Sequence, residues 1–205
     1  MFGKVASDVL GLSDVGIVIK PEDYNKVDTD DYVMHEDNER IYFLIKSKAD
    51  EYCFTNKALI HLDGTSAASK KRTLRRYDYC NYRISNVTLE TAGMMDIDVE
   101  IKFMLGKNME YSIDVHKKHM EELKDLYKAL IRIGIVQSDS EALLGFARQS
   151  LEMASTTLSQ IRSTEGVLSQ QFKELNQIAF DWLASTRNRY LVTDYGFVFD
   201  RYINS

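Results

Sequence analysis

The sequence predicts an α+β protein in which a seven-stranded antiparallel barrel is capped by a C-terminal α-helix and followed by an α-helical hairpin. Apolar and polar residues alternate repeatedly between residues 40 and 115, as they do in short strands. A helical pattern follows from Lys117 to Ile133, and a double pattern of the same kind spans 138–189. Short strands must close on themselves or form a second layer to cover their apolar faces, and one helix can plug the open corner.

The composition suits a folded protein that does not bind nucleic acid. Hydrophobic residues make up 44% of the 205 residues, which suffices for a packed core. The net charge is −5. A nucleic-acid partner requires a basic face, so we expect none.

Two further features bear on the compartment. The isolated cysteines, Cys53 and Cys80, form no motif and predict free thiols in a reducing environment. No segment reaches the roughly 20 apolar residues of a spanning helix. We expect a cytoplasmic protein, with membrane association as the alternative.

Residues 1–39 are predicted to form an N-terminal helix and an acidic connector. The apolar residues of the first twelve positions have helical spacing, and this helix would pack on protein or lie in a membrane interface. Acidic residues are dense between Asp14 and Glu39, without the ligand spacing of an EF-hand. We expect a solvated connector there.

The strand pattern defines a domain over residues 40–135. Alternation is clearest from Asp96 to Leu105, and it shifts near Ser85 and Asn86, which predicts a bulge. The predicted strands cover 41–46, 52–54, 57–62, 70–79, 83–91, 96–105 and 109–115.

The helix from Lys117 to Ile133 is the element that should close the barrel. Its apolar stripe must be buried, and it consists of Met120, Leu123, Leu126, Tyr127, Leu130 and Ile131. Asp114 is its predicted N-cap. Gly134 is expected to end it in the left-handed conformation.

Residues 136–205 are predicted to form a helical hairpin for oligomerisation and an aromatic tail. Ser138 or Ser140 would cap the first helix and Thr164 the second. The oligomerisation residues that we assign are Leu144, Leu151, Leu158, Phe172, Leu175 and Trp182. Further apolar residues lie outside this seam and need another surface. The tail, 190–205, is expected to dock as an extended segment.

A basic run in the predicted 70–79 strand is a candidate site for an anionic headgroup or phosphate. Five cations in seven residues stand next to tyrosines, and two lysines of the first hairpin complete the tentative set: Lys46, Lys48, Lys70, Lys71, Arg72, Arg75 and Arg76. A charge-rich strand that protects a sheet edge explains the same residues.

No catalytic or metal-binding pattern is present in the sequence. The four histidines, His35, His61, His116 and His119, lack further ligands at zinc spacing and are expected to be exposed polar residues. Glycine-rich phosphate loops and nucleophile elbows are absent. We therefore predict no catalytic residues, no metal and no cofactor.

The layout from Arg40 to Ile133 resembles a pleckstrin-homology (PH) domain. The stretch from Lys71-Arg72-Thr73-Leu74 to Asn86-Val87-Thr88-Leu89-Glu90 is similar to the middle of the bacterial branch of that superfold. A barrel followed by such a hairpin resembles bacterial PH proteins with a YvbH-like C-terminal extension, a resemblance that implies oligomerisation. It does not imply inositide binding, because the first hairpin offers Lys46 and Lys48 and then two acids.

These observations together predict a non-enzymatic, homo-oligomeric PH-like binding or scaffold protein whose hairpin mediates self-association. Its expected partners are further copies of itself and a protein or peptide bound at a sheet edge. The alternative is a peripheral protein that binds an anionic membrane surface through multivalent basic patches.

Overall fold

The computed structural model describes residues 14–64, 72–91, 97–159 and 168–203. The chain divides into two compact units. The sheet unit comprises Met1–Ile135 and Thr193–Ser205, and the helical unit comprises Val136–Val192. The chain therefore leaves the sheet unit, builds the helical unit and returns.

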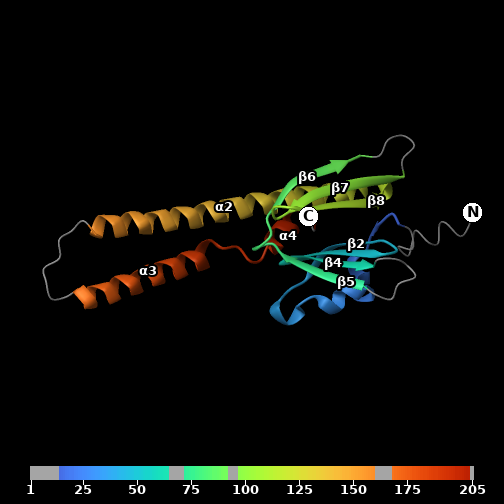
Figure 1. Ribbon diagram of the computed structural model, residues 1–205. Helices are drawn as coiled ribbons and strands as arrows, with labels where there is room; N and C mark the ends of the chain where they lie inside the picture. Colours follow the sequence, from blue (N-terminus) through green and yellow to red (C-terminus); the bar gives the residue numbers. More distant parts are fainter. Residues whose placement is uncertain (1–13, 65–71, 92–96, 160–167, 204–205) are drawn as a thin grey trace, which may run out of the picture. The chain divides into compact units, whose positions relative to one another are not determined.

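Two antiparallel sheets form two layers of the sheet unit (Figure 1). The first has the order β1 (Ile17–Val18), β2 (Ile41–Lys46), β3 (Asp50–Thr55), β4 (Ala58–Gly64) and β5 (Arg72–Asp78). The second has the order β6 (Ile84–Glu90), β7 (Asp98–Leu105) and β8 (Met109–His116). The seven predicted strands correspond to β2–β8. The two-residue strand β1 was not predicted, because two residues are too short to show alternation.

The predicted closed barrel is instead a pair of sheets that meet at one corner. A parallel bridge joins Gly16 to Val115 there. The backbone N–H of Gly16 donates to the Asp114 carbonyl over 2.8 Å, and that of His116 donates to the Gly16 carbonyl over 2.9 Å. A Cβ atom on Gly16 would lie 2.7 Å from a methyl carbon of Ile45, so only glycine fits this close approach.

The core between the sheets follows the predicted alternation. Along β7, Val99, Ile101, Phe103 and Leu105 are buried and the residues between them are half-buried. Phe103 meets Phe54 of the first sheet edge to face, with ring centroids 6.1 Å apart. In β6 the pairing register shifts between Ser85 and Thr88, and Asn86 has a φ of 51°, which confirms the predicted bulge.

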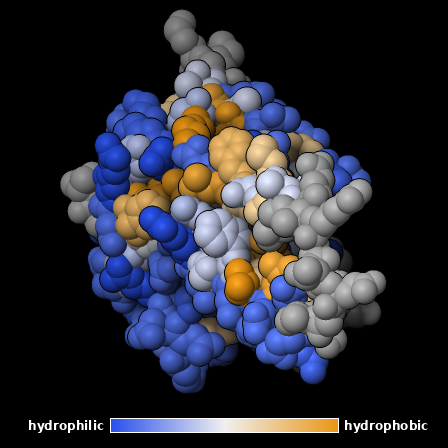
Figure 2. All heavy atoms as spheres, turned by 90° about the vertical axis from the view of Figure 1, so that its left-hand side faces the viewer, coloured by the Kyte–Doolittle hydropathy of each residue, from blue (hydrophilic) through white to orange (hydrophobic). Residues whose placement is uncertain are grey.

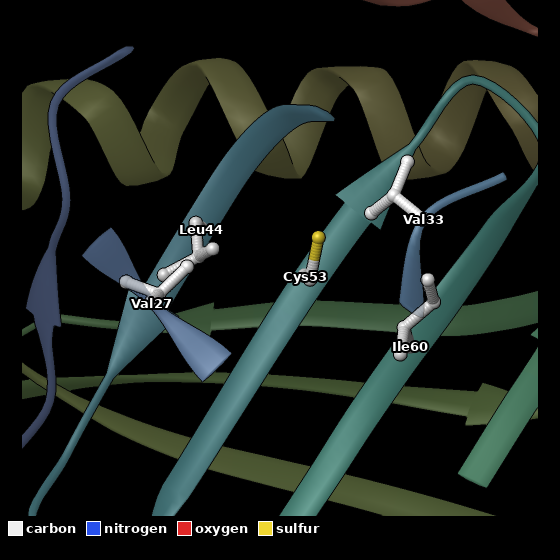
Figure 3. Packing of buried hydrophobic residues seen from close by; sticks show 5 residues of the cluster. All are labelled: Val27, Val33, Leu44, Cys53 and Ile60. Atoms are coloured by element: carbon white, nitrogen blue, oxygen red, sulfur yellow. The ribbon is translucent and has the colours of Figure 1, made fainter. Parts of the chain in front are cut away.

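The prediction of a solvated connector over residues 14–39 is wrong. Three short 3-10 helices, η1 (Pro21–Lys26), η2 (Asp28–Tyr32) and η3 (His35–Asp37), cover the outer face of the first sheet. Figure 3 shows two valines of this segment over three strands, in a cluster of Val27, Val33, Leu44, Cys53 and Ile60. Acidic side chains dominate the composition, but Val27 and Val33 between them are buried. The predicted helix over residues 1–12 lies outside the described residues.

A buried carboxylate fixes this covering segment. Glu51 on β3 is only 3% exposed. It accepts the backbone N–H of Thr29 at 2.9 Å and pairs with the Lys46 ammonium. Without these partners, a buried carboxylate would be costly.

The capping helix is longer than predicted. After a 3-10 turn, η4 (Lys117–His119), helix α2 runs from Met120 to Ser159 and contributes to both units. Leu123, Leu126 and Leu130 are fully buried, as the stripe predicted. The side chain of His116, not Asp114, accepts the N–H of Lys118 at the start.

Gly134 does not end the helix. A Cβ atom there would lie 2.6 Å from the carbonyl oxygen of Ile84, so glycine lets α2 approach β6 closely. Ser138 and Ser140 lie within α2 and cap nothing. The second helix, α3, covers Leu168–Tyr190, and Thr164 lies outside the described residues.

The tail is a helix of the sheet unit and not an extended segment. Tyr195, Val198 and Phe199 on or beside α4 (Gly196–Tyr202) are buried. Phe199 stacks on Tyr42 at 5.1 Å between centroids. The Tyr195 N–H donates to the Asn56 carbonyl over 2.7 Å.

We predict that Phe199→Ala destabilises the sheet unit by about 3–5 kcal/mol, the range for truncating a fully buried phenylalanine. Phe197, on the same helix, is 54% exposed and provides the control. Phe197→Ala should cost less than about 0.5 kcal/mol. Chemical denaturation monitored by circular dichroism measures both, and equal costs would contradict the docked tail.

Candidate functional site

The basic run does not form a free cationic patch in the part of it that the structure describes. Arg72 pairs with Asp28 of the covering segment. Arg75 Nη1 lies 2.6 Å from a carboxylate oxygen of Asp63. Lys70 and Lys71 lie outside the described residues. The described arginines therefore neutralise acids of their own chain.

Arg76 belongs to a buried network around Glu39. Its Nη1 donates to Glu39 at 2.9 Å, and its Nε donates to Asp78 at 2.8 Å. The Glu39 side chain is fully buried and also accepts the Thr55 hydroxyl and the Met34 N–H. Burial raises the pKa of Glu39, but Arg76, Thr55 and the Met34 N–H outweigh it, so the pKa lies below the ordinary value of 4.5.

The two hairpin lysines do not join the arginines. Lys46 pairs with buried Glu51. Lys48 is exposed in the turn between β2 and β3. Of the tentative anionic site, the structure therefore leaves only Lys48 as a described cation with no acidic partner among the described residues.

A second candidate is an exposed apolar surface on the helical unit, here called the hairpin surface. On the face drawn in Figure 2, apolar groups stand together within a mostly hydrophilic surface. Large apolar side chains of both helices are between 41% and 70% exposed: Leu143, Phe146 and Met153 on α2, and Phe172, Leu175, Ile178, Phe180, Trp182 and Leu183 on α3. Such exposure exceeds what isolated surface residues explain.

The hairpin surface includes a groove of about 340 Å³. Phe146 and Trp182 line it from the two helices, and Tyr190 lies at the end of α3. The indole N–H of Trp182 donates to the Ala147 carbonyl over 3.3 Å, which holds the ring in place while 47% of the residue stays exposed.

The residues that we assigned to the oligomerisation seam differ in their exposure. Leu144 and Leu151 are half-buried, whereas Phe172, Leu175 and Trp182 are exposed in the single chain. The side chain of Leu158 is not described. An amphipathic pattern predicts which face is apolar, but not whether its own hairpin or another copy covers it.

The prediction that all four histidines are exposed holds for His35 but is wrong for half-buried His116, for His119, whose side chain is 14% exposed, and for His61. His61 is 8% exposed on β4 and lies among the tyrosines of neighbouring strands. Tyr52 and Tyr111 alternate with buried Phe54 and Ile113 along their strands, so strand alternation could have indicated part of this grouping from the sequence. Neither Cys53 nor Cys80 is part of a disulfide, as predicted.

No cluster of three or more His, Cys, Asp or Glu among the described residues could hold a metal ion. No helix in the described part of the chain is long and apolar enough to cross a membrane.

Comparison with known proteins identifies the class. Residues 9–134 match the family model of the bacterial PH domain, and 145–205 match that of the YvbH-like oligomerisation region. The chain belongs to the bacterial PH domain family and carries a YvbH-like oligomerisation region. The segment that covers the first sheet therefore falls within the PH domain match.

Individual relatives resemble the whole chain. The uncharacterized protein YvbH of Bacillus subtilis (strain 168) is 57% identical over 205 residues, which is all of both chains. A crystal structure of a PH domain containing protein from Exiguobacterium sibiricum 255-15 is 50% identical, with a TM-score of 0.84. That match covers 93% of this chain and 100% of the other.

We predict that Arg76→Ala destabilises the sheet unit by about 3 kcal/mol, because it leaves the buried Glu39 carboxylate without its cation. Arg72→Ala removes a pair whose side chains are 43% and 59% exposed, and should cost less than about 1 kcal/mol. Urea unfolding compares the two variants. A larger cost for Arg72→Ala would show that the Glu39 network is not the stabilising one.

The lowered pKa of Glu39 predicts an acid-sensitive contribution to stability. Its carboxylate favours the folded state above the unfolded pKa, and this contribution is lost as the pH falls through the lower folded pKa. The unfolding free energy of the wild type should therefore fall more steeply with acid, around and below pH 4.5, than that of Glu39→Gln. Parallel curves in urea titrations across this range would refute the assignment.

Proposed function

We propose that this protein is a non-enzymatic scaffold that self-associates through the hairpin surface. The observation that carries the proposal is a coincidence of two features. The large apolar side chains that the single chain leaves exposed on the helical unit lie almost entirely within residues 145–205, which match an oligomerisation region.

A second copy is the occupant that this surface favours. Apolar burial contributes roughly 25 cal/mol for each Å² removed from water, so aromatic residues such as Phe172 and Phe146 offer a large gain when they are covered. The groove between Phe146 and Trp182 could accept an apolar side chain of the other copy. The groove and the exposed rings occur on the same unit. One copy can therefore supply the groove, and another copy can supply the ring that fills it.

The connectivity makes this self-association useful to the PH domain. Helix α2 begins in the sheet unit, and after α3 the chain returns there through α4. Both ends of the helical unit are therefore covalently continuous with elements packed on the sheets. Association of helical units brings several sheet units into one assembly and raises the effective concentration of any weak binding site on them.

Binding to an anionic membrane receives less support. Attraction to an anionic membrane requires cations that are free to face the lipid. Each such cation contributes about 1 kcal/mol to the binding free energy. Arg72, Arg75 and Arg76 are instead engaged by Asp28, Asp63 and Glu39.

We predict that the wild type is a homo-oligomer at micromolar concentration and that Phe172→Glu with Ile178→Glu reduces its mass toward that of one chain. Two charges in a buried apolar interface cost several kcal/mol. These residues are 70% and 63% exposed in the single chain, so the helix itself should tolerate them. Light scattering after size exclusion measures the mass, and circular dichroism checks the helix content.

The matched control adds two charges to the polar side of the same helix, with Gln170→Glu and Asn188→Glu. Both positions are exposed and lie away from Phe172 on a helical wheel. This variant should keep the wild-type mass. A monomeric wild type, or equal loss of mass in both variants, would refute self-association through the hairpin surface.

A further inference from the structure

A hollow of about 410 Å³ lies in the sheet unit, apart from the hairpin surface. It is called the tyrosine hollow here. Strands β3, β4 and β5 of the first sheet contribute Tyr52, His61, Arg75 and Tyr77, and the second sheet contributes residues 108–112. Side chains from both sheets therefore converge on one open space.

Strand alternation explains why tyrosines stand there. Tyr52 precedes buried Phe54 by two residues, and Tyr111 precedes buried Ile113 by two, so both tyrosines lie on the inward face of their strands. Inward positions in the core carry phenylalanine and isoleucine, whereas those beside the hollow carry tyrosine and histidine. The residues keep an aromatic face for packing and add a polar group where the interior opens.

The rings are held in fixed orientations by one another. Tyr111 stacks on core Phe103 at 5.4 Å between centroids, with planes 6° apart. It meets Tyr52 and Tyr77 nearly at right angles, at 6.2 Å and 5.9 Å. Tyr52 in turn stacks on His61 at 4.4 Å. Differently oriented rings in packed positions form a preorganised surface with π-electron density.

Hydrogen bonds orient the histidine and one tyrosine. His61 Nε2 lies 3.1 Å from a carboxylate oxygen of Asp50, and Nδ1 lies 3.3 Å from the hydroxyl of Tyr111. With the Nε2–H donating to Asp50, Nδ1 accepts the proton of Tyr111. The hydrogen bonds that link Asp50, His61 and Tyr111 therefore fix which lone pairs and protons face the hollow.

The charge around the hollow favours a cation. Arg75 is matched by Asp63 at 2.6 Å, whereas the side-chain partner of Asp50 is a histidine ring. Glu110 is the carboxylate among the lining residues, and Asp50 lies behind the His61 ring. Burial first, and then the negative charges of Asp50, Asp63 and Asp114, raise the pKa of Tyr52, as expected for a hydroxyl in a negative potential.

We propose that the tyrosine hollow binds a small, soluble organic cation that carries a methylated ammonium group. Tyrosine faces attract such a cation through the ring quadrupole, and the carboxylates add direct attraction. A methylated ammonium loses less hydration on entry than a compact inorganic ion does. An anionic ligand would instead meet Glu110, and the lining cation Arg75 is already matched by Asp63.

The experiment titrates the full-length protein with choline and with tetramethylammonium, using isothermal calorimetry and ligand-observed NMR. The uncharged isostere 3,3-dimethylbutanol tests whether charge is required, and inorganic phosphate tests the opposite charge. We expect saturable binding of both cations, and none of the alcohol or phosphate. No saturable cation binding, equal binding of the alcohol, or preferential binding of phosphate would overturn the proposal.

Variants localise the binding. Tyr77→Leu removes a ring and Asp50→Asn removes a charge, and each should weaken cation binding about tenfold. Tyr77→Phe keeps the ring and should keep the affinity, which separates loss of the site from loss of folding. Tyr32→Leu, at a tyrosine outside the hollow that is 49% exposed, is the matched control.

Two further outcomes, one from the variants and one from sedimentation of the protein with phosphatidylcholine vesicles, would overturn the proposal. The first is unchanged binding in Tyr77→Leu and Asp50→Asn. The second is protein that sediments with phosphatidylcholine vesicles but binds no free choline, because the site would then require a lipid surface rather than a soluble cation.

Discussion

The first sheet carries apolar side chains on both faces, and the rest of the sheet unit follows from the need to cover them. Every residue of β4 from Ala58 to Leu62 is buried. The second sheet covers one face through contacts such as Phe54 with Phe103. The other face, with Leu44, Cys53 and Ile60, requires a separate cover, and the segment over residues 14–39 supplies it. Without that segment, the strands would expose an extended hydrophobic surface.

Charge pairing then holds this acidic cover in place. Glu51 binds the backbone of η2, Glu39 binds Arg76, and Asp28 binds Arg72. Two of these carboxylates are buried, so their partners satisfy groups that water no longer solvates. Arg72 and Arg76 are engaged in these pairs and are therefore not available to an anionic ligand. A structural role therefore accounts for the described arginines of the basic run, and the apolar side chains of the helical unit become the stronger candidate for interaction.

Continuity of α2 links the two units of the chain. One face of its first part, with Leu123, Leu126 and Leu130, is buried in the sheet unit, and a later stretch exposes Phe146 and Met153. The helix passes Gly134 without a break because the glycine relieves a contact with Ile84 instead of taking the left-handed conformation. The return of the chain through α4, fixed by Phe199 and Tyr195, ties the far end of the helical unit to the same core. The helical unit is thus covalently joined to the sheet unit at both of its ends.

The sequence by itself determined the fold class, the strands β2–β8 and the buried stripe of α2, because local periodicity reports which side of an element faces the core. It also indicated a hairpin with more apolar residues than its own seam can bury. Only the tertiary structure decided that Val27 and Val33 belong to the core, that α4 docks as a helix, and that Arg76 serves Glu39. Those outcomes depend on partners that are distant in the chain. The two valines lack a periodic pattern, a glycine supports either a helix end or a close approach, and the charge of an arginine does not reveal which carboxylate it meets.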